Sequence, residues 1–111
     1  MAKKKLTLFL IDDDPMHSDM LQNHLDQTLD ADFKVYHSGE DAITSLDLEP
    51  EIIVLDYHLD SQGKNRLNGI QVLQEIKAQK PSSQVIILSG QDDINVAVDM
   101  MRYGAYDYVV K

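Results

Sequence analysis

Residues 51–56 read Glu-Ile-Ile-Val-Leu-Asp, four apolar residues between two carboxylates. An unbroken apolar run is typical of a parallel strand that is covered on both faces of its sheet. Three more hydrophobic runs end in a residue suited to phosphate or metal chemistry: 6–11 before Asp12, 85–88 before Ser89 and 106–110 before Lys111. Parallel strands present their carboxyl ends along one edge, where ligands of open α/β sheets bind. We therefore expect the four endings to share one site.

The rest of the chain alternates between strand and helix patterns. Strands are predicted at 5–11, 33–36, 51–55, 85–88 and 106–110. Helices are predicted at 16–29, from Ser38 and Gly39 through Leu46, from a cap at Asn68 to Gln79, and at 92–103. Strands that alternate with helices through right-handed crossovers predict a three-layer α/β sandwich around a doubly wound, five-stranded parallel sheet. Because residue 111 directly follows the last strand, we expect a final helix, and any output domain beyond it, to be absent from this chain.

Composition limits the classes of function. The chain has 111 residues, which suits one domain spanning 1–111. Its net charge of -9 disfavours direct nucleic-acid binding, because the phosphate backbone would be repelled. No apolar run approaches a membrane span, and the chain has no cysteine, so a cytoplasmic location is expected.

The sequence Asp12-Asp13-Asp14 is the densest acidic cluster. Acidic residues after a strand often only cap the next helix, which Pro15 here helps to begin. Three adjacent like charges repel one another, however, unless a cation relieves them, and Mg²⁺ prefers carboxylates together with water and phosphate oxygens. Asp56 could likewise be a simple cap, or a carboxylate nucleophile that forms an aspartyl phosphate.

Ser89 and Lys111 carry little information separately. A serine at a strand end is usually hydrogen-bonded to backbone, and a lone lysine is usually on the surface. Beside Asp56, however, Ser89 could donate a hydrogen bond to a phosphoryl oxygen and Lys111 could pair with its charge.

The chain resembles the receiver domains of two-component response regulators from about residue 4 to its end. The motifs that carry the resemblance are Leu-Phe-Leu-Ile-Asp-Asp-Asp-Pro, Ile-Ile-Val-Leu-Asp, Val-Ile-Ile-Leu-Ser-Gly and Gly-Ala-Tyr-Asp-Tyr-Val-Val-Lys, at 8–15, 52–56, 85–90 and 104–111. This family has the flavodoxin-like strand order 2-1-3-4-5. The resemblance implies a Mg²⁺-dependent phosphoacceptor that switches an output or partner, with a sensor histidine kinase or histidine phosphotransfer protein as donor.

The resemblance also implies roles for single residues. Asp56 would accept the phosphoryl group, and Asp12 and Asp13 would form the acidic pair. Asp13, Asp56 and the backbone carbonyl of His58 would ligate Mg²⁺, whereas Asp14 would not be a direct ligand. Three further positions match the switch serine, the conserved-type lysine and the switch aromatic of the family: Ser89, Lys111 and Tyr108.

The loop after the third strand departs from the family pattern. Asp60 stands where a proline is usual, and the matching glycine, Gly69, comes five residues late. The loop at 57–67 therefore carries an insertion, and we expect it to affect kinase docking or the access of hydrolytic water.

Two other functions fit part of the pattern. A haloacid-dehalogenase-type phosphohydrolase would use Asp12 as nucleophile and Asp14 as acid/base, but Pro15 stands where that family has glycine. A receiver-like module that binds or dimerises without phosphorylation remains the alternative. Phosphorylation on Asp56 distinguishes it from a phosphoacceptor.

The fourth helix has two apolar stripes. The stripe of Ile94, Ala97, Val98, Met101 and Ala105 is predicted to face the core. A second stripe consists of Val96, Met100 and Tyr103 and has two interpretations. These apolar groups are either covered by the final helix or simply exposed, or they form a homodimer interface on the fourth helix and fifth strand. The four histidines show no paired ligand spacing and are interpreted as ordinary surface or partly buried residues, not as a zinc site: His17, His24, His37 and His58.

Overall fold

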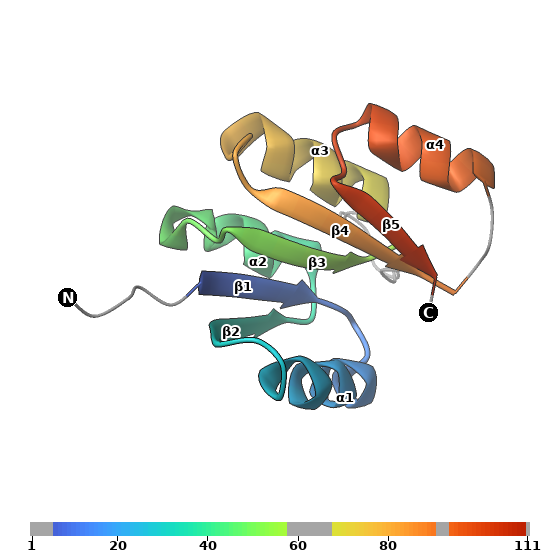
Figure 1. Ribbon diagram of the computed structural model, residues 1–111. Coiled ribbons are helices and arrows are strands. Elements are labelled where there is room, and N and C mark those ends of the chain that lie inside the picture. Colours follow the sequence, from blue (N-terminus) through green and yellow to red (C-terminus); the bar gives the residue numbers. More distant parts are fainter. Residues whose placement is uncertain (1–5, 58–67, 91–93, 111) are drawn as a thin grey trace.

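The fold is a five-stranded, wholly parallel sheet with the order β2-β1-β3-β4-β5 (Figure 1). The computed structural model describes residues 6–57, 68–90 and 94–110. The strands are β1 (Leu6–Ile11), β2 (Ala31–Tyr36), β3 (Ile52–Asp56), β4 (Gln84–Ser89) and β5 (Asp107–Val110). The helices are α1 (Pro15–Asp26), α2 (Gly39–Thr44), the 3₁₀ turn η1 (Leu46–Leu48), α3 (Gly69–Gln79) and α4 (Ile94–Arg102). The predicted fold class and strand order are thus confirmed.

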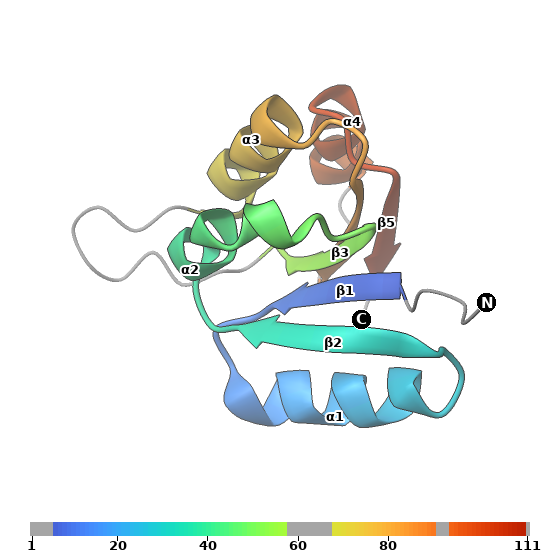
Figure 2. The same cartoon turned by 90° about the vertical axis from the view of Figure 1, so that its left-hand side faces the viewer.

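Helices lie on both faces of the sheet, which gives three layers. Figures 1 and 2 show α1 on one face, beside β1 and β2, and α2, α3 and α4 on the other. On the α1 face, the described residues place no helix over β4 and β5, and Val109 of β5 is exposed there. No described helix is long and apolar enough to cross a membrane.

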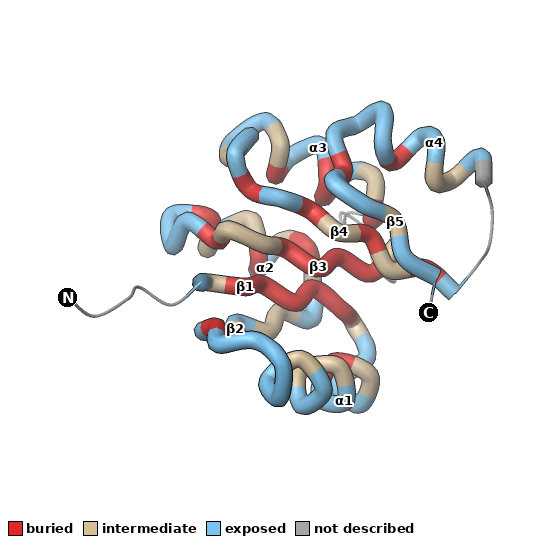
Figure 3. The backbone as a smooth tube through the Cα atoms, in the orientation of Figure 1, coloured by how far each residue is buried: buried red, intermediate tan, exposed pale blue. Residues whose placement is uncertain are grey.

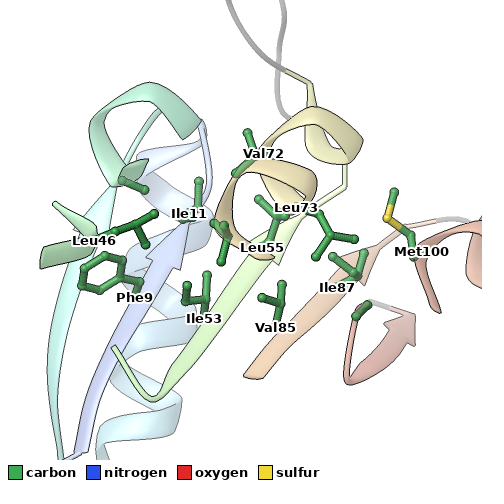
Figure 4. Close-up of a cluster of buried hydrophobic side chains, with 13 residues drawn as sticks. Phe9, Ile11, Leu46, Ile53, Leu55, Val72, Leu73, Val85, Ile87 and Met100 are labelled. Atoms are coloured by element: carbon green, nitrogen blue, oxygen red, sulfur yellow. The ribbon is translucent and has the colours of Figure 1, made fainter. Parts of the chain in front are cut away.

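The core has one cluster on each face of the sheet. Under α1, Leu8 and Leu10 of β1 pack with Ala31 and Val54. Figure 4 shows the larger cluster on the opposite face, with these labelled members: Phe9, Ile11, Leu46, Ile53, Leu55, Val72, Leu73, Val85, Ile87 and Met100. Figure 3 shows that the buried residues are concentrated in the central strands of the sheet. Burial on both faces explains why β1 and β3 are apolar without alternation.

Local capping sets where several elements begin and end. The side chain of Asn68 accepts a hydrogen bond from the N–H of Gln71, whose side chain accepts one from the N–H of Asn68 (both 3.0 Å). This capping box confirms the predicted start of α3. Helix α1 ends three residues earlier than predicted, because β2 begins at Ala31, where the chain already pairs with Leu6 of β1.

The predicted orientation of α4 is wrong for Val98 and Met101, whereas Ala105, just beyond the helix, is buried as predicted. Met100 is fully buried in the larger cluster, and Val96 packs against it. Val98 and Met101, which were expected in the core, are each 48% exposed. The two apolar stripes are similar in strength, so periodicity alone does not distinguish them, and the long, flexible Met100 is suited to filling the space above β4.

This correction changes the predicted interface. Met100 and Val96 cannot belong to an exposed patch, whereas Tyr103 is exposed. The exposed large apolar residues of α4 and of the turn after it are Val98, Met101 and Tyr103, of which only Tyr103 belongs to the predicted interface.

Candidate functional site

Three of the predicted site residues lie buried at the carboxyl edge of the sheet. Asp12 directly follows β1, Asp56 is the last residue of β3, and Ser89 is the last residue of β4. Asp56 is in register with Leu88, so Ser89 lies one residue further along the neighbouring strand. Figure 1 shows these strands pointing in the same direction. The parallel topology therefore brings together residues that are far apart in the sequence.

The backbone around Asp12 is held from two sides. Its N–H donates to the carbonyl of Tyr36 at the end of β2 (3.0 Å). Nδ1 of His37 donates to the Asp12 carbonyl (3.0 Å). The carboxylate is held as well, because the N–H of Asp14 donates to its Oδ1 (2.9 Å). Asp12 is consequently fixed before any ligand arrives.

Asp12, Asp56 and His17 form a possible metal-ligand cluster. One ligand atom from each lies within 4.8 Å of the other two. Nδ1 of His17 contacts Oδ2 of Asp12 directly. The spacing of the histidines in the sequence did not predict that His17 would lie beside Asp12. The available signal was Pro15, which begins α1 and so places His17 on the helix turn next to the end of β1.

The two other acidic residues of the run have different positions. Asp14 is the N-cap of α1, and its Oδ1 accepts hydrogen bonds from the N–H groups of Met16 (3.0 Å) and His17 (3.4 Å). The capping interpretation is therefore right for Asp14. Asp13 is half-buried and lies outside the three-residue cluster.

The environment of Asp12 raises the pKa of its carboxyl group above the usual value for aspartate. The main cause is desolvation by burial, and the negative charge of Asp56 adds to it. The contacts with His17 and with the N–H of Asp14 act in the opposite direction and lower the pKa. The increase shows that the ionised form of Asp12 is inadequately compensated by the protein.

The donor set fits a divalent cation. Two buried carboxylates converge at one point, and their proximity carries an electrostatic cost that positive charge would remove. Carboxylate oxygens are also the protein ligands that Mg²⁺ prefers, with water completing its octahedral shell. Asp12 and Asp56 would hold such an ion.

The other predicted residues are placed as follows. Tyr108 is half-buried and packs against the larger core cluster. Lys111 and His58 lie outside the described residues, as does the insertion at 58–67. A Cβ atom on Gly69 would lie 2.8 Å from the carbonyl oxygen of Tyr57, so the start of α3 presses on the residue after Asp56. This contact explains the need for glycine at position 69.

A family model, "Response regulator receiver domain", matches residues 8–111. The chain belongs to this receiver family. The match includes all the strand ends that form the site. Receiver domains of two-component response regulators are signalling domains that bind Mg²⁺ at an acidic pocket and interact with histidine kinases.

Individual relatives agree with this assignment. The receiver is 29% identical over its whole length to the probable C4-dicarboxylate response regulator DctR of Priestia megaterium, but spans only 47% of that protein. It is 28% identical to the chemotaxis protein CheY of Listeria monocytogenes, over 96% of this chain and 86% of CheY. The receiver domain of NtrX from Brucella abortus superposes with a TM-score of 0.80 at 30% identity, covering 94% of this chain and 84% of that one.

Proposed function

We propose that Asp56 accepts a phosphoryl group from a phosphohistidine, in a reaction that depends on Mg²⁺. The observation that carries this proposal is the convergence of the Asp56 and Asp12 carboxylates at the carboxyl edge of the sheet, with Ser89 buried on the adjacent strand. Residues 1–111 would act as one receiver unit. The donor would be a sensor histidine kinase or a histidine phosphotransfer protein.

The chemistry is a phosphoryl transfer between two side chains. A carboxylate oxygen of Asp56 attacks phosphorus, a P–O bond forms, the P–N bond to the donor histidine breaks, and the imidazole leaves. Bound Mg²⁺ would neutralise charge on the carboxylates and on the incoming phosphoryl oxygens. Asp12 and Asp13 would contribute to holding that ion, directly or through water, with Asp56 and the carbonyl of His58.

Ser89 and Lys111 would bind the phosphoryl group. The hydroxyl of Ser89 would donate to one phosphoryl oxygen, and the ammonium group of Lys111 would pair with the charge. Their positions support these roles, since Ser89 ends β4 and is in register with Val110, the residue before Lys111. The domain would thereby catalyse its own phosphorylation and dephosphorylation without acting on a separate substrate.

The phosphoryl group would bias a conformational equilibrium. Ser89 would move toward the new oxygens, Tyr108 would follow, and the surface of α4 and β5 would change its population of inactive and active arrangements. Tyr108 and Met100 of α4 pack in the same core cluster, which supports coupling between them. The active arrangement would control an output domain or partner, and would favour a homodimer through α4 and β5.

The test is intact-mass analysis after incubation with phosphoramidate, a small phosphodonor, with and without Mg²⁺. Wild type should gain one phosphoryl group only when Mg²⁺ is present, and Asp56→Asn should gain none, because an amide lacks the nucleophilic carboxylate. Asp99→Asn is the matched control: Asp99 is exposed on α4, and this variant should behave like wild type.

The same experiment tests the alternative module. If folded wild type binds Mg²⁺ but gains no phosphoryl group, the domain binds or dimerises without phosphorylation. A gain that persists in Asp56→Asn would place the phosphoryl group elsewhere and contradict the assignment of Asp56.

A further inference from the structure

The acidic site contains a nitrogen donor, His17, in addition to the carboxylate oxygens that Mg²⁺ prefers. His17 offers a ring nitrogen within 4.8 Å of carboxylate oxygens from both Asp12 and Asp56. Its side chain is 32% exposed, whereas that of Asp12 is 4% exposed. The imidazole is therefore more accessible to solvent than the Asp12 carboxylate that it contacts.

The position of His17 is set by the start of α1. Asp14 caps the helix by accepting a hydrogen bond from the His17 N–H, and Pro15 restricts the backbone of the first turn. Asp12 is itself held by Tyr36, His37 and the N–H of Asp14. Both donors are consequently positioned by backbone contacts, and neither has to be recruited from a distant segment.

The size of the cluster suits a single ion. Two ligands on opposite sides of a metal are about 4.2 Å apart, twice a bond length of about 2.1 Å. The three donors span up to 4.8 Å. The most distant pair would move slightly closer, while His17 and Asp12 would separate to admit the ion. The present contact between His17 and Asp12 is one that a shared cation would replace.

Imidazole and carboxylate ligands differ in the ions they favour. Mg²⁺ takes oxygen ligands and gains little from a neutral nitrogen donor. Imidazole suits zinc, nickel, copper and iron, and affinities for nitrogen-containing sites rise along the first transition row. A site of two carboxylates and one imidazole therefore has a different selectivity from a site of carboxylates alone.

We propose that His17 is a direct metal ligand in this site, and that it increases the preference of the receiver for first-row transition-metal dications relative to Mg²⁺. This inference rests on the proposed function only in requiring that Asp12 and Asp56 bind a divalent cation. The phosphorylation state of the receiver would then respond to which of these ions occupies the site.

The first experiment detects the bond directly. Mn²⁺ is added to the purified protein, and pulsed electron paramagnetic resonance is used to measure coupling of the Mn²⁺ electron spin to ¹⁴N. Wild type should show ¹⁴N coupling and His17→Ala should show none. His24→Ala is the control, since His24 is an exposed histidine of the same helix, and this variant should retain the coupling. Absence of ¹⁴N coupling in wild type, or its persistence in His17→Ala, would overturn the proposal.

The second experiment measures selectivity. Zn²⁺ or Mg²⁺ competes with Mn²⁺ bound to the protein, and the electron paramagnetic resonance signal of free Mn²⁺ reports how much Mn²⁺ is displaced. The ratio of Zn²⁺ to Mg²⁺ affinity should fall at least about tenfold in His17→Ala relative to wild type and His24→Ala. His17→Gln, which can still hydrogen-bond to Asp12 but lacks the imidazole, should give the same fall. It also serves if His17→Ala fails to fold. An unchanged ratio means that His17 only orients Asp12, and would overturn the proposal.

The outcomes separate this inference from the proposed function. If wild type is phosphorylated with Mg²⁺ but its metal selectivity does not depend on His17, only the inference fails. If wild type binds none of the three ions, the cation-dependent function fails with it.

Discussion

At the scale of single residues, Asp12 is a buried carboxylate close to a second one, Asp56. Burial and the charge of Asp56 raise the pKa of the Asp12 carboxyl, so its ionised form opposes folding when no cation is bound. A variant that lacks the charge of Asp12 should be more stable than wild type in the absence of metal. Adding a divalent cation should raise the stability of this variant less than that of wild type.

Asp12→Asn should therefore raise the melting temperature of the metal-free protein at neutral pH. Because the folded-state pKa of Asp12 is raised, the cost is absent below the ordinary pKa of aspartate and fully present above the raised value. The difference between mutant and wild type should consequently grow as pH rises from about 4 to about 8. Calorimetry over this range measures it, with Asp99→Asn as the exposed control. A difference that shrinks with rising pH would contradict the direction of the shift.

Gly69 is a second residue at which a small substitution, the addition of a Cβ atom, should change the stability of the fold. Gly69→Ala would place a Cβ 2.8 Å from the backbone oxygen of Tyr57, which cannot rotate away as a side chain can. We expect a loss of about 1–3 kcal/mol in the free energy of unfolding, the usual range for overpacking. Gly90→Ala is the comparison, since nothing lies within 4 Å of its added Cβ. Equal stability of the two variants in urea unfolding would refute the close contact.

At the scale of elements, α4 illustrates a limit of periodicity. Its two apolar stripes predicted an amphipathic helix correctly but assigned Val98, Met101 and Met100 to the wrong faces, while Ala105 was assigned correctly. The buried face is defined by Met100, which reaches the cluster shared by β4 and α3, and by Ala105 just beyond the helix. Packing against neighbouring elements, which are distant in sequence, selected one stripe over the other.

The orientation of α4 can be tested with adjacent methionines. Met100→Ala should cost about 2–5 kcal/mol of unfolding free energy, because it leaves a cavity in a fully buried position. Met101→Ala, one residue later and 48% exposed, should cost less than about 0.5 kcal/mol. Urea denaturation of both variants gives the two values. The reverse order would restore the orientation predicted from sequence.

The exposed face of α4 should matter only for association. Tyr103→Glu puts a charge at an exposed apolar position next to the end of α4, and should prevent phosphorylation-dependent dimers without altering stability by more than about 0.5 kcal/mol. Sedimentation velocity with and without phosphoramidate measures the dimer. Asp99→Asn on the same helix should dimerise like wild type. Dimers that persist in Tyr103→Glu would exclude this surface as the interface.

At the scale of the whole molecule, the sheet connects the proposed phosphorylation site to α4. Ser89 is fully buried at the end of β4, beside the strand that carries Asp56. Tyr108 of β5 and Met100 of α4 pack in one cluster with the residues of β4. A movement at Ser89 would therefore act on the strand whose side chains pack in the same cluster as Tyr108 and Met100.

Ser89→Ala should separate phosphorylation of the domain from the dimerisation that phosphorylation promotes. The variant keeps Asp12 and Asp56 and should still gain a phosphoryl group in the presence of Mg²⁺. It lacks the hydroxyl that would draw β4 toward the phosphoryl group, so phosphorylation should no longer promote dimers. Ser82→Ala, at an exposed serine far from this edge, should behave like wild type. Intact mass and sedimentation on the same samples decide it, and full dimerisation of phosphorylated Ser89→Ala would contradict the role of Ser89 as a switch.

The sequence alone determined the fold class, because unbroken apolar runs and alternating helix patterns are local properties of the chain. It also placed Asp12, Asp56 and Ser89 at the carboxyl edge, since strand ends of a parallel sheet must meet there. The start of α3 at Asn68 was predictable for the same local reason, a capping box within four residues.

Only the tertiary structure decided which face of α4 is buried, that Asp13 lies outside the cluster, and that His17 contacts Asp12. Each depends on contacts between elements: α4 against the core, β1 against β2, and the first turn of α1 over the end of β1. Periodicity and spacing describe one segment at a time. The direction of a side chain at a junction depends on how two segments meet, and that is settled by packing across the whole fold.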